Sequence, residues 1–265
     1  MKKKKLRIIH NMARSGSTVM CKCLGSMEGV ALLSEQHPLG WNLFNPLVQA
    51  STWFNLITPS ELEEFKQKNT IKFLGAITLI EERCGDRGLT LVLRDWAHVD
   101  YTGAPFVKAP RYSPLIYSEL SGHFDIIRIS TTRDPVTQWQ SLAQLPYMEN
   151  VLKSGALCLE QFLLGYRKYA ELCVETGFIR YEDFLRKPEF AMQKLCGQLE
   201  IKFDPSFSTK WVDYKTISGD VHTERSQKIK IQTKRPIDPE LRKRFLSNPD
   251  YHRACELLGY NPVEK

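Results

Sequence analysis

Apolar residues along this chain alternate between short β-favouring runs and longer stretches with helical spacing. Apolar runs lie at residues 6–10, 30–33, 89–93 and 125–131, and a weaker run lies at residues 177–181. Helical patterns fill the intervals, at residues 17–27, 59–69, 75–83, 113–120, 136–145, 157–175 and 188–199. Strands that alternate with helices predict an α/β fold with a central parallel sheet and helices on both faces.

The 265 residues contain no internal repeat, low-complexity tract or long linker, so we expect a single domain over residues 1–265. Residues 1–5 are interpreted as a basic leader to the first strand. Residues 218–239 combine glycine, proline and charged residues without periodicity, which predicts a long loop before a terminal helix. No apolar run reaches the length of a membrane span, so none is expected.

The net charge of +7 is concentrated in two places. Residues 1–7 carry five positive charges, and residues 225–244 carry eight against two acidic residues. A nucleic-acid-binding surface usually spreads its charge over one face, interleaved with aromatic residues. The observed distribution favours a basic tail and a local anion-binding segment, so no nucleic-acid partner is expected.

The seven cysteines are odd in number and lack the spacing of metal ligands: Cys21, Cys23, Cys84, Cys158, Cys173, Cys196 and Cys255. We interpret them as buried free thiols in a reducing compartment, which predicts a cytoplasmic protein without a metal site.

The first apolar run is followed at once by Arg14-Ser15-Gly16-Ser17-Thr18 and then by a helical pattern. A strand that turns into a helix through glycine and small hydroxyl residues directs backbone N–H groups to one point at the positive end of the helix dipole. The segment lacks the second glycine and the Gly-Lys pair of a Walker A loop. It predicts a site for a phosphate-like group that differs from the usual ATP or GTP loop.

A second candidate anion site follows the run at residues 125–131. Asp134 and Pro135 suit an N-cap and a first helical turn, which places Arg133 at the carboxyl end of the strand. Ser141 comes about two helical turns later, and ligands of open α/β sheets bind at this edge. The alternative is a capped surface helix beside a solvated arginine.

Together, these segments resemble the PAPS-dependent sulfotransferases, and the compact bacterial-type members more than the animal phenol and steroid enzymes. Members of this family transfer a sulfuryl group from 3′-phosphoadenosine 5′-phosphosulfate (PAPS) to an alcohol or amine. Residues 14–18 match the loop that holds the 5′-phosphosulfate, and Arg133 and Ser141 match the pair that binds the 3′-phosphate. Tyr181, in a Tyr-Glu-Asp turn after a strand, matches a tyrosine near the adenine. The resemblance covers about residues 6–205 and implies the P-loop-containing nucleotide hydrolase-like fold.

The sequence departs from the family pattern in four places, one of which is that His98 lies two residues later than the catalytic histidine of the animal pattern. Arg14 stands where the animal enzymes have lysine, and Val19 stands where many have an adenine-stacking tryptophan, so the adenine needs another partner. Arg225 and Lys228 lie in the basic loop at residues 218–239, where the family closes a segment over the 3′-phosphate, although their spacing differs from the animal Arg-Lys-Gly pattern. A solvated basic loop is the alternative.

Sulfuryl transfer requires in-line positioning and charge stabilisation, and its phosphate leaving group is already a stable anion, so the resemblance implies no metal. Arg14 would neutralise charge on the bridging oxygen. The acceptor hydroxyl needs a base, for which His98 and Glu35 are both candidates and His37 a weaker one.

Neighbouring acidic residues bear on the choice of base. Asp95 or Asp100 would orient the imidazole of His98. An ion pair between Arg94 and Asp95 is the structural alternative.

Aromatic residues in loops near the predicted site suggest a small-molecule acceptor that is apolar or aromatic, although core packing would also explain them. These residues are Trp41, Phe44, Trp53, Phe54, Tyr101, Phe106 and Tyr147. The sequence thus predicts a PAPS-dependent sulfotransferase. A P-loop kinase-like phosphotransferase and a non-catalytic nucleotide-binding protein are the alternatives.

Overall fold

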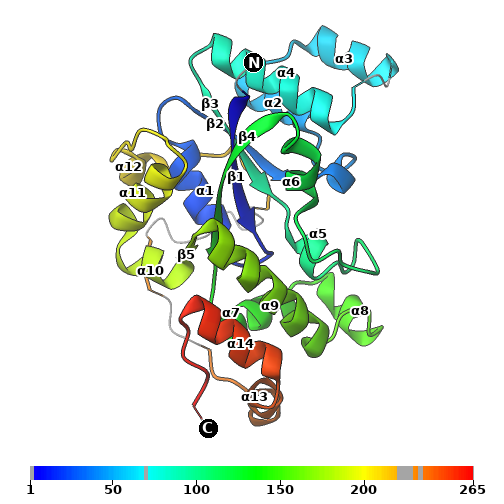
Figure 1. Ribbon diagram of the computed structural model, residues 1–265, viewed down its shortest axis with the longest axis vertical. Coiled ribbons are helices and arrows are strands. Elements are labelled where there is room, and N and C mark those ends of the chain that lie inside the picture. The colour runs from blue at the N-terminus through cyan, green and yellow to red at the C-terminus, as the bar shows by residue number, and fades with distance from the viewer. Residues whose placement is uncertain (1–2, 69–70, 220–228, 232–234, 265) are drawn as a thin grey trace.

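A five-stranded parallel sheet forms the centre of the molecule, in the strand order β2-β3-β1-β4-β5 (Figure 1). A computed structural model describes residues 3–68, 71–219, 229–231 and 235–264. The strands are β1 (Lys4–Asn11), β2 (Val30–Gln36), β3 (Thr90–Asp95), β4 (Phe124–Thr132) and β5 (Phe178–Arg180). All five predicted strands are present and parallel, which confirms the α/β fold. β1 begins at Lys4, within the predicted leader, because Lys4 and Lys5 already pair with β4.

Helices cover the sheet and its carboxyl end. They are α1 (Ser17–Gly25), η1 (Pro38–Gly40), α2 (Pro46–Phe54), α3 (Pro59–Lys68), α4 (Phe73–Asp86), α5 (His98–Tyr101), α6 (Leu115–Leu120), α7 (Pro135–Ala143), α8 (Met148–Lys153), α9 (Leu159–Thr176), α10 (Tyr181–Arg186), α11 (Pro188–Gln198), α12 (Phe207–Lys210), α13 (Pro239–Leu246) and α14 (Pro249–Leu258). Helix α2 was not predicted. The single terminal helix that was expected is instead the pair α13 and α14.

The two faces of the sheet are buried against different helices because successive side chains of a strand point to opposite sides. In β1, Ile9 packs into the apolar cluster formed with α1 and α11. The neighbouring Ile8 packs into the cluster formed with α2 and α4. Both isoleucines are fully buried, and burial on both faces explains why the strands read as apolar runs without alternation.

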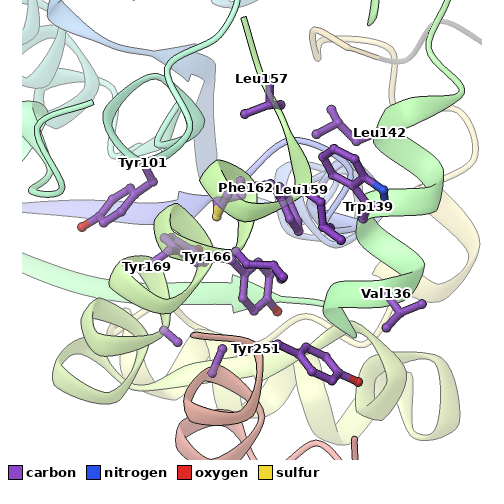
Figure 2. Packing of buried hydrophobic residues seen from close by; sticks show 14 of the residues in the cluster. Tyr101, Val136, Trp139, Leu142, Leu157, Leu159, Phe162, Tyr166, Tyr169 and Tyr251 are labelled. Carbon is purple, nitrogen blue, oxygen red and sulfur yellow. The ribbon is translucent and has the colours of Figure 1, made fainter. Parts of the chain in front are cut away.

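Two tyrosines of α9 support the carboxyl ends of the central strands, and both rings lie in a third apolar cluster (Figure 2). The hydroxyl of Tyr169 lies 2.8 Å from the carbonyl oxygen of His10 and 2.9 Å from that of Thr131, so its single proton is shared between β1 and β4. The hydroxyl of Tyr166 donates to the carbonyl oxygen of Arg133. These bonds fix the ends of the two strands from which the two candidate anion-binding segments begin.

Candidate active site

The segment between β1 and α1, which we call the anion loop (residues 12–18), turns through two left-handed residues. Arg14 has φ 65° and Gly16, the N-cap of α1, has φ 81°. Because glycine has no side chain to cap the first turn, the N–H groups of that turn stay available to a bound anion. A Cβ on Gly16 would lie 2.3 Å from Cδ2 of Tyr181, so only glycine fits beneath this ring. Tyr181, the first residue of α10, therefore packs directly on the anion loop.

Side chains from β4 and α7 meet the anion loop. The Nη1 of Arg133 donates to the carbonyl oxygen of Arg14 at 3.1 Å, and the Arg133 guanidinium lies 5.2 Å from the centre of the Tyr181 ring. The Nε of Arg14 donates to the hydroxyl of Ser141 at 3.0 Å. The structure thus gathers Arg14, Gly16, Arg133, Ser141 and Tyr181, which the sequence had assigned to one site from three separate segments.

Arg133 is half-buried at the point where β4 ends and α7 begins. Asp134 caps α7 by accepting from the backbone N–H of Thr137 at 2.8 Å, as its position before Pro135 predicted. Burial lowers the pKa of Arg133. Its buried Nε has no hydrogen-bond partner among the described residues, and buried polar groups are normally satisfied. An anionic ligand would supply the missing acceptor.

Arg94, at the end of β3, is a member of this site that the sequence reasoning did not assign to it. Its Nη2 donates to the hydroxyls of Ser17 and Thr18 at 3.1 Å each. The Arg94–Asp95 ion pair that was considered is not formed, because Asp95 pairs instead with Nδ1 of His10 at 2.6 Å. The position of β3 next to β1 in the sheet brings Arg94 to the anion loop.

His98, the first candidate base, is a buried residue of α5. Its pKa is lowered to about 4, mainly by burial and also by the charge of His37, while Asp100 partly opposes the shift. The Nδ1 of His98 has no partner within the described part of the chain. The ring lines a small apolar cavity together with Met12 and Ala13 of the anion loop. His98 is therefore a neutral imidazole next to the loop at neutral pH.

Glu35, the second candidate base, has a left-handed backbone with φ 56°, where β2 pairs irregularly with β3. Its Oε1 lies 3.9 Å from Nη2 of Arg94. His37 has a structural role, since its Nδ1 accepts from the backbone of Leu39 and its Nε2 lies 3.2 Å from Oδ2 of Asp100. Asp100 thus contacts His37 rather than orienting His98 by a hydrogen bond.

Some of the predicted acceptor-site aromatics lie beside His98. Phe106 lies 5.4 Å from His98 and 4.5 Å from Trp96, measured between ring centres, and Phe44 lies 5.0 Å from Trp96. Tyr147 lines the same small cavity as His98 and is exposed on its outer side. These rings form an apolar surface next to the candidate base.

Other aromatics in that prediction pack wholly or partly into the core, the alternative that the sequence also allowed. Tyr101 is buried, with its ring 5.4 Å from that of Tyr169. Trp41 and Phe54 pack against the cluster of α2 and α4, and Trp53 contacts Phe54. The unpredicted helix α2 explains the positions of Trp53 and Phe54, because these two residues are part of a packed helix and not of a loop near the site.

Arg225 and Lys228 lie outside the described residues. Further along the same basic segment, Arg235 donates to the side chain of Gln144, and the Pro236 carbonyl oxygen accepts from Gln140 at 3.0 Å. Arg235 also lowers the pKa of Arg133 by charge repulsion. The described end of the segment therefore runs along α7 with a positive charge near Arg133.

Three further observations concern the described residues only. No three His, Cys, Asp or Glu side chains are arranged to hold a metal ion. The cysteines are all free, and only Cys158 is not buried. No helix is both long and apolar enough to cross a membrane.

No protein-family model and no curated protein matches the sequence. Solved structures that share its fold include two sulfotransferase domains. The sulfotransferase domain of the olefin synthase of Synechococcus PCC 7002 is 17% identical, with a TM-score of 0.67 over 98% of this chain and 97% of that one. The sulfotransferase domain from the curacin biosynthetic pathway is 16% identical, with a TM-score of 0.68 over 99% and 100% of the two chains. The chain has the P-loop-containing nucleotide hydrolase-like fold of these domains, as predicted.

Proposed function

We propose that this protein is a PAPS-dependent sulfotransferase that transfers a sulfuryl group to the hydroxyl or amine of a small apolar acceptor. The observation that carries the proposal is the meeting of the anion loop and the β4–α7 segment through Arg14, Arg133 and Ser141. PAPS bears one anionic group on each side of its ribose, and a ligand of this kind needs two separate anion sites. Guanidinium groups and hydroxyls suit phosphate recognition.

Each part of the site has a role in this proposal. The loop from Ser15 to Thr18 would hold the 5′-phosphosulfate through the N–H groups of Gly16, Ser17 and Thr18 and through the Ser17 and Thr18 hydroxyls. Arg133 and Ser141 would hold the 3′-phosphate, and Tyr181 would lie near the adenine. Arg235 supports this assignment by adding positive charge near Arg133.

Arg225 and Lys228 are proposed to close over the 3′-phosphate. They lie in the basic segment that leads to Arg235.

The reaction forms a bond between sulfur and the acceptor oxygen, or the nitrogen of an amine, while the bond between sulfur and the bridging phosphate oxygen breaks. PAPS supplies an activated sulfuryl group and leaves as 3′-phosphoadenosine 5′-phosphate (PAP). Arg14 would neutralise the charge that develops on the bridging oxygen. The proton of the acceptor passes to a base of the protein.

We assign the base to His98 in preference to Glu35. The His98 ring shares a cavity with Met12 and Ala13 of the anion loop, and its buried Nδ1 has no hydrogen-bond partner among the described residues. Glu35 instead faces Arg94, for which it is a countercharge. The apolar rings beside His98 support an apolar acceptor.

Thermal-shift measurements with PAP, and with ATP or GTP plus Mg²⁺, test the proposed function. PAP should raise the Tm by several degrees and the two triphosphates should not, because only a ligand that binds the folded state stabilises it. Arg133→Ala should abolish the PAP shift. The control Arg253→Ala, at an arginine of α14 paired with Glu256, should retain it.

Absence of any PAP shift in the wild-type protein would overturn the proposal. Turnover of ATP with Mg²⁺ would favour the phosphotransferase alternative. A protein that binds PAP but sulfates none of a panel of apolar alcohols, phenols and amines would be a nucleotide-binding protein.

A further inference from the structure

Arg94 is almost completely buried, with 4% of its surface exposed, and all five of its N–H groups are used. The acceptors are Oδ1 of Asn11 at 3.3 Å, the Ser34 hydroxyl at 3.0 Å, the Ser218 carbonyl oxygen at 3.1 Å, and the hydroxyls of Ser17 and Thr18 at 3.1 Å each. One side chain therefore connects β1, β2, α1 and the segment after α12.

All five acceptors are neutral groups. The carboxylate that faces Arg94, that of Glu35, stays at 3.9 Å, beyond hydrogen-bond distance. Burying a cation with so loose a countercharge is costly for folding. Such an arrangement favours a role in binding, because an anion at the adjacent loop would complete the charge balance.

The contacts with Ser17 and Thr18 fix the direction of their hydroxyl groups. A hydroxyl has one proton to donate and two lone pairs that accept. Because each oxygen accepts a hydrogen bond from Arg94, each keeps its own proton for another acceptor. A cationic donor also polarises the hydroxyl, which makes it a stronger donor in turn. Both residues belong to the first turn of α1, at the positive end of the helix.

We propose that Arg94 is a positioning residue that directs the Ser17 and Thr18 hydroxyl protons toward the group bound at the 5′ side of the nucleotide. This inference rests on the proposed function. In it, Arg94 acts on the ligand indirectly, through the hydroxyls of Ser17 and Thr18. Its effect is therefore specific to the 5′-phosphate and leaves recognition of the 3′-phosphate intact.

The test compares two ligands that differ only in the 5′-phosphate, PAP and adenosine 3′-monophosphate, by isothermal titration calorimetry. Arg94→Met should weaken PAP binding by about 10- to 100-fold, the size expected for charge-assisted hydrogen bonds. It should change binding of the monophosphate less than about threefold, because that ligand has no 5′ group for the hydroxyls to contact. Arg94→Lys keeps the charge and three donors, and should restore part of the PAP affinity.

Arg7→Met is the matched control, since Arg7 lies on β1 but points to the Leu199 carbonyl oxygen, away from the loop. It should leave both affinities unchanged. The inference would be overturned if Arg94→Lys weakened the binding of PAP and of adenosine 3′-monophosphate by the same factor. It would also be overturned if Arg94→Met left the ratio of these two affinities as it is in the wild-type protein. A wild-type protein that binds neither ligand would instead contradict the proposed function.

Discussion

The Nε of Arg14 lies 3.0 Å from the hydroxyl oxygen of Ser141, a residue 127 positions further along the chain. This bond joins the anion loop to α7 and places a residue assigned to the 5′ side next to one assigned to the 3′ side. The two side chains should therefore contribute to nucleotide binding as a coupled pair.

Ser141→Ala should weaken PAP binding by about tenfold and Arg14→Ala by more, because hydrogen bonds to charged groups are the stronger ones. The double variant should lose less than the sum of the two losses, since the residues share a bond. Calorimetric titration of the four proteins gives the coupling. If the losses of PAP affinity in the two single variants added exactly in the double variant, the contact would have no part in binding. Ser208→Ala on α12 is the control.

Gly16→Ala should both destabilise the protein and abolish PAP binding. Its φ of 81° and the Tyr181 ring 2.3 Å from the new Cβ exclude a side chain there. Strain of this kind costs about 1–3 kcal/mol, measurable by urea unfolding. Gly197→Ala in α11, where a Cβ meets nothing within 4 Å, should be neutral or stabilising. Wild-type stability and affinity in Gly16→Ala would contradict the geometry of the loop.

His98→Gln should reduce turnover by about 100-fold or more, in line with the loss of a general base, and leave the PAP affinity within about twofold. Glu35→Gln should retain most of the turnover. With a pKa of about 4, the wild-type imidazole stays neutral well below pH 6.5, so turnover should persist at pH 5.5. If Glu35→Gln lost turnover and His98→Gln retained it, the base would be Glu35.

The same pKa links His98 to stability. Unfolding returns the imidazole to a pKa near 6.5, so the unfolded state binds the proton first and the free energy of unfolding falls as the pH drops below 6.5. The loss amounts to about 2 kcal/mol by pH 5. Urea unfolding at pH 8 and pH 5 should show a smaller difference for His98→Gln than for the wild type. If the free energy of unfolding differed between pH 8 and pH 5 by the same amount in both proteins, His98 would be in a solvated environment.

Phe106→Ser should raise the KM for apolar acceptors by about 3- to 30-fold, the effect of losing part of one apolar contact, with PAP affinity unchanged. Phe106 is 43% exposed although it contacts both Trp96 and His98. Phe190→Ser in α11, at a phenylalanine that is 66% exposed, is the control and should leave the KM unchanged. An unchanged KM in Phe106→Ser would place the acceptor elsewhere.

Most of the residues that meet at the candidate site could be predicted because they belong to local motifs. Arg14, Gly16 and the Asp134-Pro135 cap are each recognisable from their immediate neighbours. Arg94 could not be assigned in this way, because its role depends on the strand order, in which β3 lies directly beside β1. Nothing in the local sequence specifies that order.

Tyr101 shows a second limit of the sequence. It follows a polar strand end, which is typical of a site residue, but α5 is a single helical turn without a readable periodicity. In the fold this turn packs on α9, where a Cβ on Gly165 would lie 2.0 Å from the Tyr101 carbonyl oxygen. Tyr101 is therefore buried by a helix more than 50 residues away along the chain.

The hydroxyl of Tyr169 shares its hydrogen bond between the carbonyl oxygens of His10 and Thr131. This bond holds β1 and β4 together near their carboxyl ends, just before the two loops begin. The separation between the two candidate anion-binding segments is consequently set by the sheet. Nucleotides should then be discriminated by the distance between their anionic groups. A linear polyphosphate on one side of the ribose would occupy only half of the site, however many charges it carries.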